Sequence, residues 1–311
     1  AAGRARQLIE RAAALGEPPE DPLLLFSALE ALWQTKIVAF NGDAARGQAA
    51  QILALAERQG GKVPLTVGHR ASGSSLVYTG NFAEGRVHYD QVIALYDPVE
   101  HRPLAGRFVQ NSLVSALIIR SLGLWALGYP EAALAGTEQA LHEARETGHA
   151  GALMHAMSNI CLIHVISGNQ AAAKSLSDEQ IALAEDKGSG YWKTTGSLRR
   201  AGVLALSGQA ADAVCTFLSA IPAWRSSRAS LYFPVWLSLL ARAYGELGQY
   251  DEATSRISEA ITAVETTKEK WYEAEVHRIA GEIALMSREP DTTKAEACFE
   301  RALSVARAQK A

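Results

Sequence analysis

The chain has 311 residues, 48% of them hydrophobic, and alanine and leucine predominate. One compact core of this size would be unusual, so we expect either two domains or an elongated array. The formal net charge of −3 excludes a general attraction to nucleic acid or to an anionic membrane, and no apolar stretch is long enough to span a membrane.

The cysteines and the two ends of the chain indicate its setting. Cys161, Cys215 and Cys298 lie far apart and in no metal-like spacing, which favours a reduced, cytoplasmic environment. No signal peptide stands at the start. Because the chain begins at Ala1 and stops within a helical pattern at Ala311, we expect a fragment of a longer protein, truncated at its C-terminus.

Helical patterns run through the whole chain, and no segment alternates as a strand does. In chain order we predict a leading helix at 3–15, a stiff Pro-rich connector at 16–22, and seven helix pairs. The predicted pairs are 23–41/43–59, 64–79/82–96, 104–127/130–146, 150–167/170–187, 191–207/210–225, 231–247/250–267 and 270–287/291–309. Residues 1–22 thus form a leader, and residues 23–311 form one elongated array.

A glycine turn follows the first helix of most pairs and supplies a left-handed helix stop. The turn glycines are Gly42, Gly80, Gly128, Gly168, Gly208 and Gly248. The last four are 40 residues apart, whereas the earlier steps are 38 and 48 residues. The longer step indicates an insertion, which we place at residues 97–103. Pro222 lies inside a predicted helix and should kink or stop it.

Two columns of small residues keep step with these turns. They stand seven residues before the turn (Thr35, Gly73, Ser121, Cys161, Ala201, Ala241, Gly281) and five residues after it (Gly47, Gly85, Ala133, Ala173, Ala213, Ala253). Only a small side chain lets two crossing helices approach closely. The columns therefore predict an all-α fold, a right-handed α-α superhelix of about seven helix hairpins.

The columns resemble the tetratricopeptide repeat, TPR, in which a small residue, a large apolar residue, a turn glycine and an alanine follow in order. The best copy is 239–253, and the period of 40 exceeds the usual 34. The stretches 94–98, 125–134, 143–149 and 271–278 more specifically resemble the C-terminal repeat region of large bacterial signalling ATPases. These ATPases are often fused to class III adenylate/guanylate cyclase domains or to helix-turn-helix regulators.

The resemblance implies an upstream ATPase domain and a non-catalytic, protein-interaction and regulatory role in signal transduction for this region. A second reading is a small-molecule-sensing superhelical domain of a maltose-regulator-like transcriptional ATPase. The residues themselves hold no phosphate-binding loop, no zinc-protease motif and no nucleophile elbow. We accordingly expect no catalytic residue, no metal, no cofactor and no nucleic-acid or membrane partner.

The inner helices of such an array line a concave groove, and its residues are the candidate binding site. The candidates are Lys36, Arg70, Tyr78, Trp125, His155, Arg242 and Arg278. Their cations suit a carboxylate or an acidic peptide, and their aromatic rings suit stacking on a ligand. We expect a protein or peptide there, or upstream domains of the same chain. Two alternatives are a sugar or metabolite near Trp125 and His155, and a merely solvated inner face.

Overall fold

The computed structural model describes residues 21–104, 107–108, 110–286 and 289–311. Within these ranges the chain forms fifteen α-helices, one 3-10 helix and no strand. In the same part of the chain, no helix combines the length and apolar character that a membrane span requires. The predicted all-α fold is confirmed, whereas the predicted helix at 3–15 lies outside the described residues.

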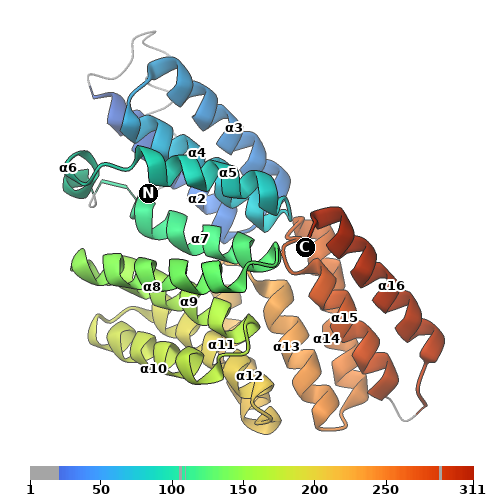
Figure 1. The fold of residues 1–311 in the computed structure, drawn as a ribbon. Helices are drawn as coiled ribbons and strands as arrows, with labels where there is room; N and C mark the ends of the chain where they lie inside the picture. The colour runs from blue at the N-terminus through green and yellow to red at the C-terminus, as the bar shows by residue number, and fades with distance from the viewer. Residues whose placement is uncertain (1–20, 105–106, 109, 287–288) are drawn as a thin grey trace.

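The helices form seven hairpins (Figure 1). They are α2 (Pro22–Val38) with α3 (Gly42–Gln59), α4 (Lys62–Tyr78) with α5 (Phe82–Leu95), α7 (Ser112–Ala126) with α8 (Pro130–Glu146), α9 (Ala150–Ile166) with α10 (Gln170–Asp186), α11 (Gly190–Leu206) with α12 (Ala210–Ser226), α13 (Phe233–Glu246) with α14 (Tyr250–Thr267), and α15 (Glu273–Met286) with α16 (Thr292–Gln309). The first helix of each hairpin packs against the first helix of the next, and these seven helices form the inner layer.

The turn glycines end the inner helices as predicted from Gly80 onward. Gly80, Gly128, Gly168, Gly208 and Gly248 have φ between 73° and 83°, a region that side chains rarely adopt. The small residues that flank these turns are buried, and most of them have no exposed surface at all. A Cβ atom added to Gly281 would lie 2.6 Å from the ring of Phe299 on the paired helix. Close helix approach therefore explains the columns.

The first hairpin departs from the predicted register by two residues. In the later hairpins the turn glycine directly precedes the N-cap residue of the second helix. In the first hairpin the N-cap of α3 is Asn41, whose side chain accepts a hydrogen bond from the Ala44 amide at 2.9 Å. Phe40, and not Gly42, therefore occupies the turn position. Thr35 and Gly47 are consequently exposed. The residues that take their places are Trp33, 1% exposed, and Ala45, 0% exposed. With Phe40 in the turn, the step to Gly80 is also 40 residues.

The insertion before α7 is longer than predicted. A helix was expected from residue 104, but α7 begins at Ser112, because the Asn111 side chain accepts a hydrogen bond from the Val114 amide at 3.0 Å. A short helix, α6 (Pro98–His101), and a 3-10 turn, η1 (Arg102–Leu104), come first. Asp97 caps α6 and also pairs with Lys62 at 2.8 Å, which ties the insertion to α4.

Pro222 was predicted to kink or stop its helix, and the stop is wrong, since α12 (Ala210–Ser226) continues through it. Proline removes one backbone hydrogen bond, which leaves the carbonyl four residues earlier without its helical donor. That residue, Leu218, is 54% exposed, and Pro222 is exposed as well. Water can therefore satisfy the carbonyl, and the helix survives on its solvent side.

The array curves back until its C-terminal hairpins meet its N-terminal ones (Figure 1). The carbonyl of Val38, at the end of α2, accepts hydrogen bonds from the amides of Ser230 at 2.8 Å and Leu231 at 3.2 Å. The carbonyl of Tyr78, at the end of α4, accepts from Lys270 at 2.9 Å and Trp271 at 3.2 Å. Helix C-termini leave such carbonyls without intrahelical donors. We call this contact the seam: Val38 and Tyr78 against residues 230–232 and 268–271.

Gly42 has its structural reason at the seam rather than in the turn. It is buried at the start of α3, and an added Cβ atom would lie 2.9 Å from Lys268 Cβ and 2.9 Å from Thr79 Cγ2. Only glycine therefore lets the first hairpin approach the loop before α15 at this distance.

Ala133 and Ala135 on α8 provide a matched test of the small-residue columns. Ala133 is 0% exposed and Ala135 is exposed. Ala133→Leu should lower the free energy of unfolding by about 1–3 kcal/mol, since extra methylenes overpack the helix crossing. Ala135→Leu should change it by less than about 0.5 kcal/mol. Urea unfolding followed by circular dichroism measures both, and equal losses would contradict the close-packing explanation.

Candidate functional site: a central cavity

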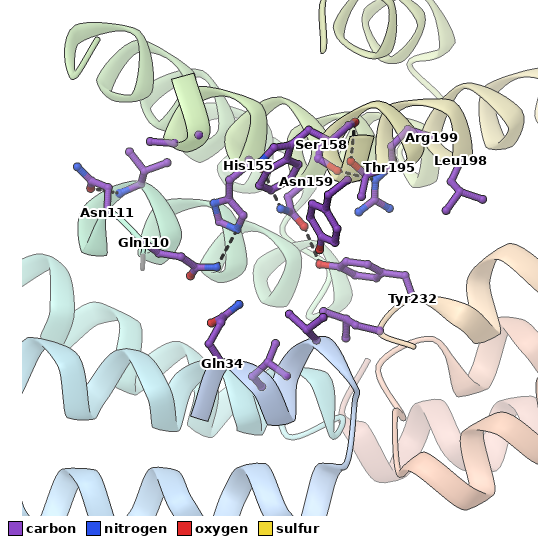
Figure 2. Close-up of a pocket in the computed structure, with 18 of the residues that line it drawn as sticks. Gln34, Gln110, Asn111, His155, Ser158, Asn159, Thr195, Leu198, Arg199 and Tyr232 are labelled. Atoms are coloured by element: carbon purple, nitrogen blue, oxygen red, sulfur yellow. Dashed lines mark hydrogen bonds between the residues drawn. The ribbon is translucent and has the colours of Figure 1, made fainter. Parts of the chain in front are cut away.

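A cavity of about 380 Å³ lies on the inner side of the seam. Its walls come from α2, α4, α7, α9, α11, α12 and α13 and from the loops before α7, α9 and α13. Figure 2 shows this arrangement for the labelled residues. The lining includes Gln34, Tyr78, Gln110, Asn111, His155, Ser158, Asn159, Tyr191, Trp192, Thr195, Leu198, Arg199, Trp224, Leu231, Tyr232 and Trp236. Residues from the first to the sixth hairpin thus line one space, which opens to solvent beside the exposed side chains of His149 and Tyr191.

Aromatic rings form much of the wall. Tyr191 lies against Trp224 with ring centroids 5.4 Å apart, and His155 lies edge-on to Trp192 at 6.2 Å. Such rings present flat apolar faces and, for tryptophan, an N–H donor at one edge. The indole Nε1 atoms of Trp224 and Trp236 are buried and have no hydrogen-bond acceptor. A wall of this kind suits a ligand with a flat apolar part and acceptor atoms.

Arg199 on α11 is the cation of the cavity, and it is 2% exposed. Its Nε donates to Ser158 Oγ at 3.3 Å, and its guanidinium carbon lies 4.5 Å from the ring centroid of Tyr232 and 4.6 Å from that of Trp236. Its Nη1 has no hydrogen-bond partner. In the described part of the chain it forms no ion pair, and burial lowers the pKa of Arg199 from its usual value.

The two rings offset part of the cost of burying Arg199. A desolvated cation over an aromatic face gains about 2 kcal/mol, whereas removing an ion from water costs several kcal/mol even after relaxation. Arginine nevertheless stays protonated in proteins. The cavity therefore holds one positive charge that the protein itself does not fully compensate.

Tyr232 joins the two sides of the seam. It adopts the left-handed conformation, with φ of 69°, which is unusual for a bulky residue. Its hydroxyl donates to Asn159 Oδ1 at 2.6 Å and accepts from the Tyr78 hydroxyl at 2.8 Å. Its amide donates to Glu269 Oε1 at 2.9 Å. Burial raises the pKa of both tyrosines, so both hydroxyls stay protonated and their two protons make these two hydrogen bonds.

Glu269 is a carboxyl buried behind Tyr232, and it is 1% exposed. Besides the Tyr232 amide, it accepts a hydrogen bond from Trp271 Nε1 at 2.9 Å. Burial raises the pKa of Glu269 from 4.5 to about 8, against the opposing effects of these two donors and of Arg199. At neutral pH it is therefore mostly protonated and does not neutralise Arg199.

A second polar network supports the opposite wall. Arg70 on α4 and Glu30 on α2 form an ion pair in which both side chains are fully buried. Arg70 Nη1 donates to Gln110 Oε1 at 2.9 Å, and Gln110 Nε2 lies 3.5 Å from His155 Nε2. Burial, with the nearby charges of Arg70 and Arg199, lowers the pKa of His155 to about 4. The ring is therefore neutral at physiological pH.

The structure brings two of the seven predicted groove residues to the cavity, Tyr78 and His155. Arg70 stands behind it, engaged by Glu30 and Gln110. The other four, Lys36, Trp125, Arg242 and Arg278, do not line it. Arg242 pairs with Glu246 one turn away, and Arg278 lies between Glu275 and Glu282, so these cations are already partnered along their own helices.

Sequence reasoning did not single out Arg199, Tyr232, Trp236 or Glu269. Arg199 stands nine residues before Gly208 and was not among the predicted groove residues. Tyr232 and Glu269 lie in loops between hairpins, whose partners across the seam are distant in sequence. In the described residues, no group of three histidine, cysteine, aspartate or glutamate side chains is placed to hold a metal ion.

No protein-family model matches this chain, and no curated protein sequence matches it. Solved structures do. A Rap protein complexed with Competence and Sporulation Factor has a TM-score of 0.63 at 12% identity, over 92% of this chain and 77% of that one. The Rap conjugation gene regulator of plasmid pLS20, in complex with the Phr* peptide, has a TM-score of 0.58 at 12% identity, over 80% and 75%.

The Cut9–Hcn1 hetero-tetramer of the APC/C has a TM-score of 0.55 at 14% identity, over 91% of this chain and 55% of that one. Identities this low establish the fold alone. With the helix pairs described above, they define the class of protein: a TPR-like helical-repeat solenoid.

Replacing Glu269 by Gln tests the buried carboxyl. The folded pKa of about 8 exceeds the unfolded value of 4.5, so the stabilising effect of the protonated form is complete below about pH 4.5 and is lost as the pH rises through about 8. From about pH 5 to about pH 8, the unfolding free energy of the wild type should fall relative to Glu269→Gln, by up to about 1.4 kcal/mol per pH unit.

Urea unfolding across this pH range measures the difference between the two proteins. Glutamine keeps an oxygen acceptor for the Tyr232 amide, so the variant should fold. His155, with its lowered pKa of about 4, changes stability in the opposite direction, but it does so equally in both proteins and cancels. Parallel pH profiles would show that Glu269 is ionised in the fold.

Proposed function

We propose that this chain is a TPR-like binding module whose ligand occupies the central cavity, and that occupancy regulates a larger signalling protein. The observation that carries the proposal is the cavity of about 380 Å³, which is lined by residues from the first to the sixth hairpin. Several of these residues carry buried polar atoms without hydrogen-bond partners. The structural likeness to Rap proteins, one of them solved with a peptide, supports a bound ligand.

The seam provides the means of regulation. A ligand in the cavity contacts Tyr78 on one side of the seam and Tyr232 on the other, so it binds the closed array better than an opened one. Ligands shift a conformational equilibrium only through such a difference in affinity. Ligand binding would then change the curvature of the array, and with it the outer surface that a partner domain or protein contacts.

The wider context of the proposal rests on the sequence resemblance. The module would belong to a cytoplasmic bacterial signalling ATPase or to an adenylate or guanylate cyclase fusion, and the catalytic steps would belong to the other domains. Upstream domains of the same chain, or a separate protein, would be the partner that reads the curvature. The array itself would contribute binding and no catalysis.

A small-molecule sensor is the second candidate function, and the size of the cavity favours it over a threaded peptide. Pockets for small ligands occupy about 300–1,000 Å³, and this cavity falls near the lower end. It equals the liquid volume of about a dozen waters at ~30 Å³ each. Either a metabolite or one end of a peptide would fill it, and the maltose-regulator-like interpretation would make the metabolite a sugar.

Ligand stabilisation in the presence and absence of a blocked cavity tests the proposal. Two pools, one of short random peptides and one of metabolites that includes maltooligosaccharides, are added to the protein before thermal unfolding. The pool that contains the ligand should stabilise the wild type, by about 2.7 kcal/mol at 100 times the dissociation constant. The identity of that pool decides between the two candidate functions.

Two tryptophan substitutions locate the effect. Ala152→Trp places a large side chain in the cavity lining and should abolish the stabilisation. Ala135→Trp, on the exposed face of α8, should leave it unchanged. Stabilisation that persists in Ala152→Trp would place the ligand elsewhere, and no stabilisation by either pool would contradict the binding role.

A further inference from the structure

We infer that the ligand of the central cavity carries a carboxylate, received by Arg199 Nη1 and the indole N–H of Trp236, and a neutral hydrogen-bond donor that faces Gln34. The inference rests on the proposed function, because it names the chemical class of ligand for the same cavity. It assigns the specificity of that cavity to residues that the groove prediction did not include.

The first step of the argument is the orientation of Arg199. Its guanidinium lies over Tyr232 and Trp236, and its Nε is fixed by Ser158. These contacts hold the side chain at 2% exposure in the cavity wall, with Nη1 as the buried atom that has no partner. A guanidinium fixed in this way is preorganised for an anion, since little side-chain freedom remains to be lost on binding.

The second step is the set of unpartnered atoms around the same space. Trp224 Nε1 and Trp236 Nε1 are buried donors without acceptors, and both residues line the cavity. Buried polar groups are rarely left without a hydrogen-bond partner. Three N–H groups that all require an acceptor match the oxygen atoms of an anion better than they match a sugar hydroxyl or an apolar group.

The third step is the net charge of the lining. Arg70 is already neutralised by Glu30, and His155 is neutral at physiological pH. Arg199 therefore leaves a single uncompensated positive charge. A carboxylate, with one negative charge, matches it, whereas a phosphate dianion would introduce a second charge that the cavity does not compensate, at a large desolvation cost.

The last step concerns the opposite wall. Figure 2 shows Gln34 entering from α2, across the cavity from Arg199 on α11. The Gln34 Oε1 atom is buried without a donor. A ligand that spans the cavity would thus place its carboxylate at α11 and an N–H or O–H group at α2. The C-terminal residue of a peptide and an acylated or hydroxylated carboxylic metabolite share this chemistry.

A fragment with these features and its neutral analogue provide the test. The probe is N-acetyl-phenylalanine, which has a carboxylate, an N–H group and an aromatic ring, and its control is N-acetyl-phenylalanine amide. Isothermal titration should show that the acid binds the wild type at least about tenfold more tightly than the amide, as expected for a hydrogen bond to a charged group. Phenyl phosphate should bind no better than the amide.

Variants on one helix assign the effect to Arg199. Arg199→Met should reduce the affinity for the acid at least about tenfold, to that of the amide, while Arg200→Met, an exposed arginine on the same helix, should retain the preference. In NMR spectra, the indole N–H resonance of Trp236 should shift when the acid is added and not when the amide is added. If Arg199→Met does not fold, two measurements on the wild type still test the inference: the ratio of its affinities for the acid and the amide, and the shift of the Trp236 resonance.

Further probes distinguish the two sources of the carboxylate. The tripeptide Gly-Gly-Phe should bind more tightly than 3-phenylpropionate if the natural ligand is a peptide end, and less tightly if it is a metabolite. Equal binding of acid and amide, both blocked by Ala152→Trp, would overturn the carboxylate and leave the proposed function standing. No binding of any acid at about 10 mM, above the dissociation constant of a typical fragment, would overturn the inference, while the pools test the proposed function separately.

Discussion

The hydrogen bonds that close the array at the seam are the interaction on which the rest of this structure depends. A solenoid is stabilised by contacts between neighbouring repeats, so its first and last hairpins need not meet. Here the carbonyls of Val38 and Tyr78, at the ends of two inner helices, accept amide donors from loops near the other end of the chain. Without this contact the inner helices would face an open groove; with it they surround a cavity. Gly42 is part of the same constraint, because any larger residue would hold the first hairpin away from Lys268.

The closed arrangement also explains the unusual ionisable groups. Burial removes nearly all water from Arg199 and Glu269 and part of it from His155, and each group responds according to its charge. Burial disfavours the charged forms of the carboxyl and the imidazole. Glu269 therefore keeps its proton, with a pKa of about 8, and His155 loses its second ring proton, with a pKa of about 4. Arginine cannot do so within the stable pH range of a protein. The result is a space in which one cation remains charged while its nearest titratable neighbours do not, and this is the basis on which we infer a monoanionic ligand.

The sequence predicted the repeat because each hairpin follows from local rules. A turn glycine must reverse the chain, and a small residue must stand where two helices cross. The positions of Gly128 and Ala133 are therefore occupied by residues of the same kind in most other hairpins. The first hairpin misled the register because Gly42 is small for a different reason, the approach of a loop that is distant in sequence. The same limit applies to the cavity: Tyr78 and His155 lie on a predicted inward face, but the partner of Tyr78 is Tyr232, 154 residues away. Contacts between the two ends of an array leave no periodic pattern.

The backbone hydrogen bonds of the seam contribute an energy on the scale that a ligand can change. Four backbone hydrogen bonds cross it to Val38 and Tyr78, and at about 0.5–1.5 kcal/mol each they contribute only a few kcal/mol. A ligand must favour one state by about 5.5 kcal/mol to move an equilibrium from 1:99 to 99:1, and a micromolar ligand that binds the closed array alone supplies about 8 kcal/mol at a 1 M standard state. A much larger interface would hold the array closed regardless of ligand. The proposed dependence of curvature on occupancy requires a closure whose energy is comparable to that of ligand binding, with the cavity directly behind it.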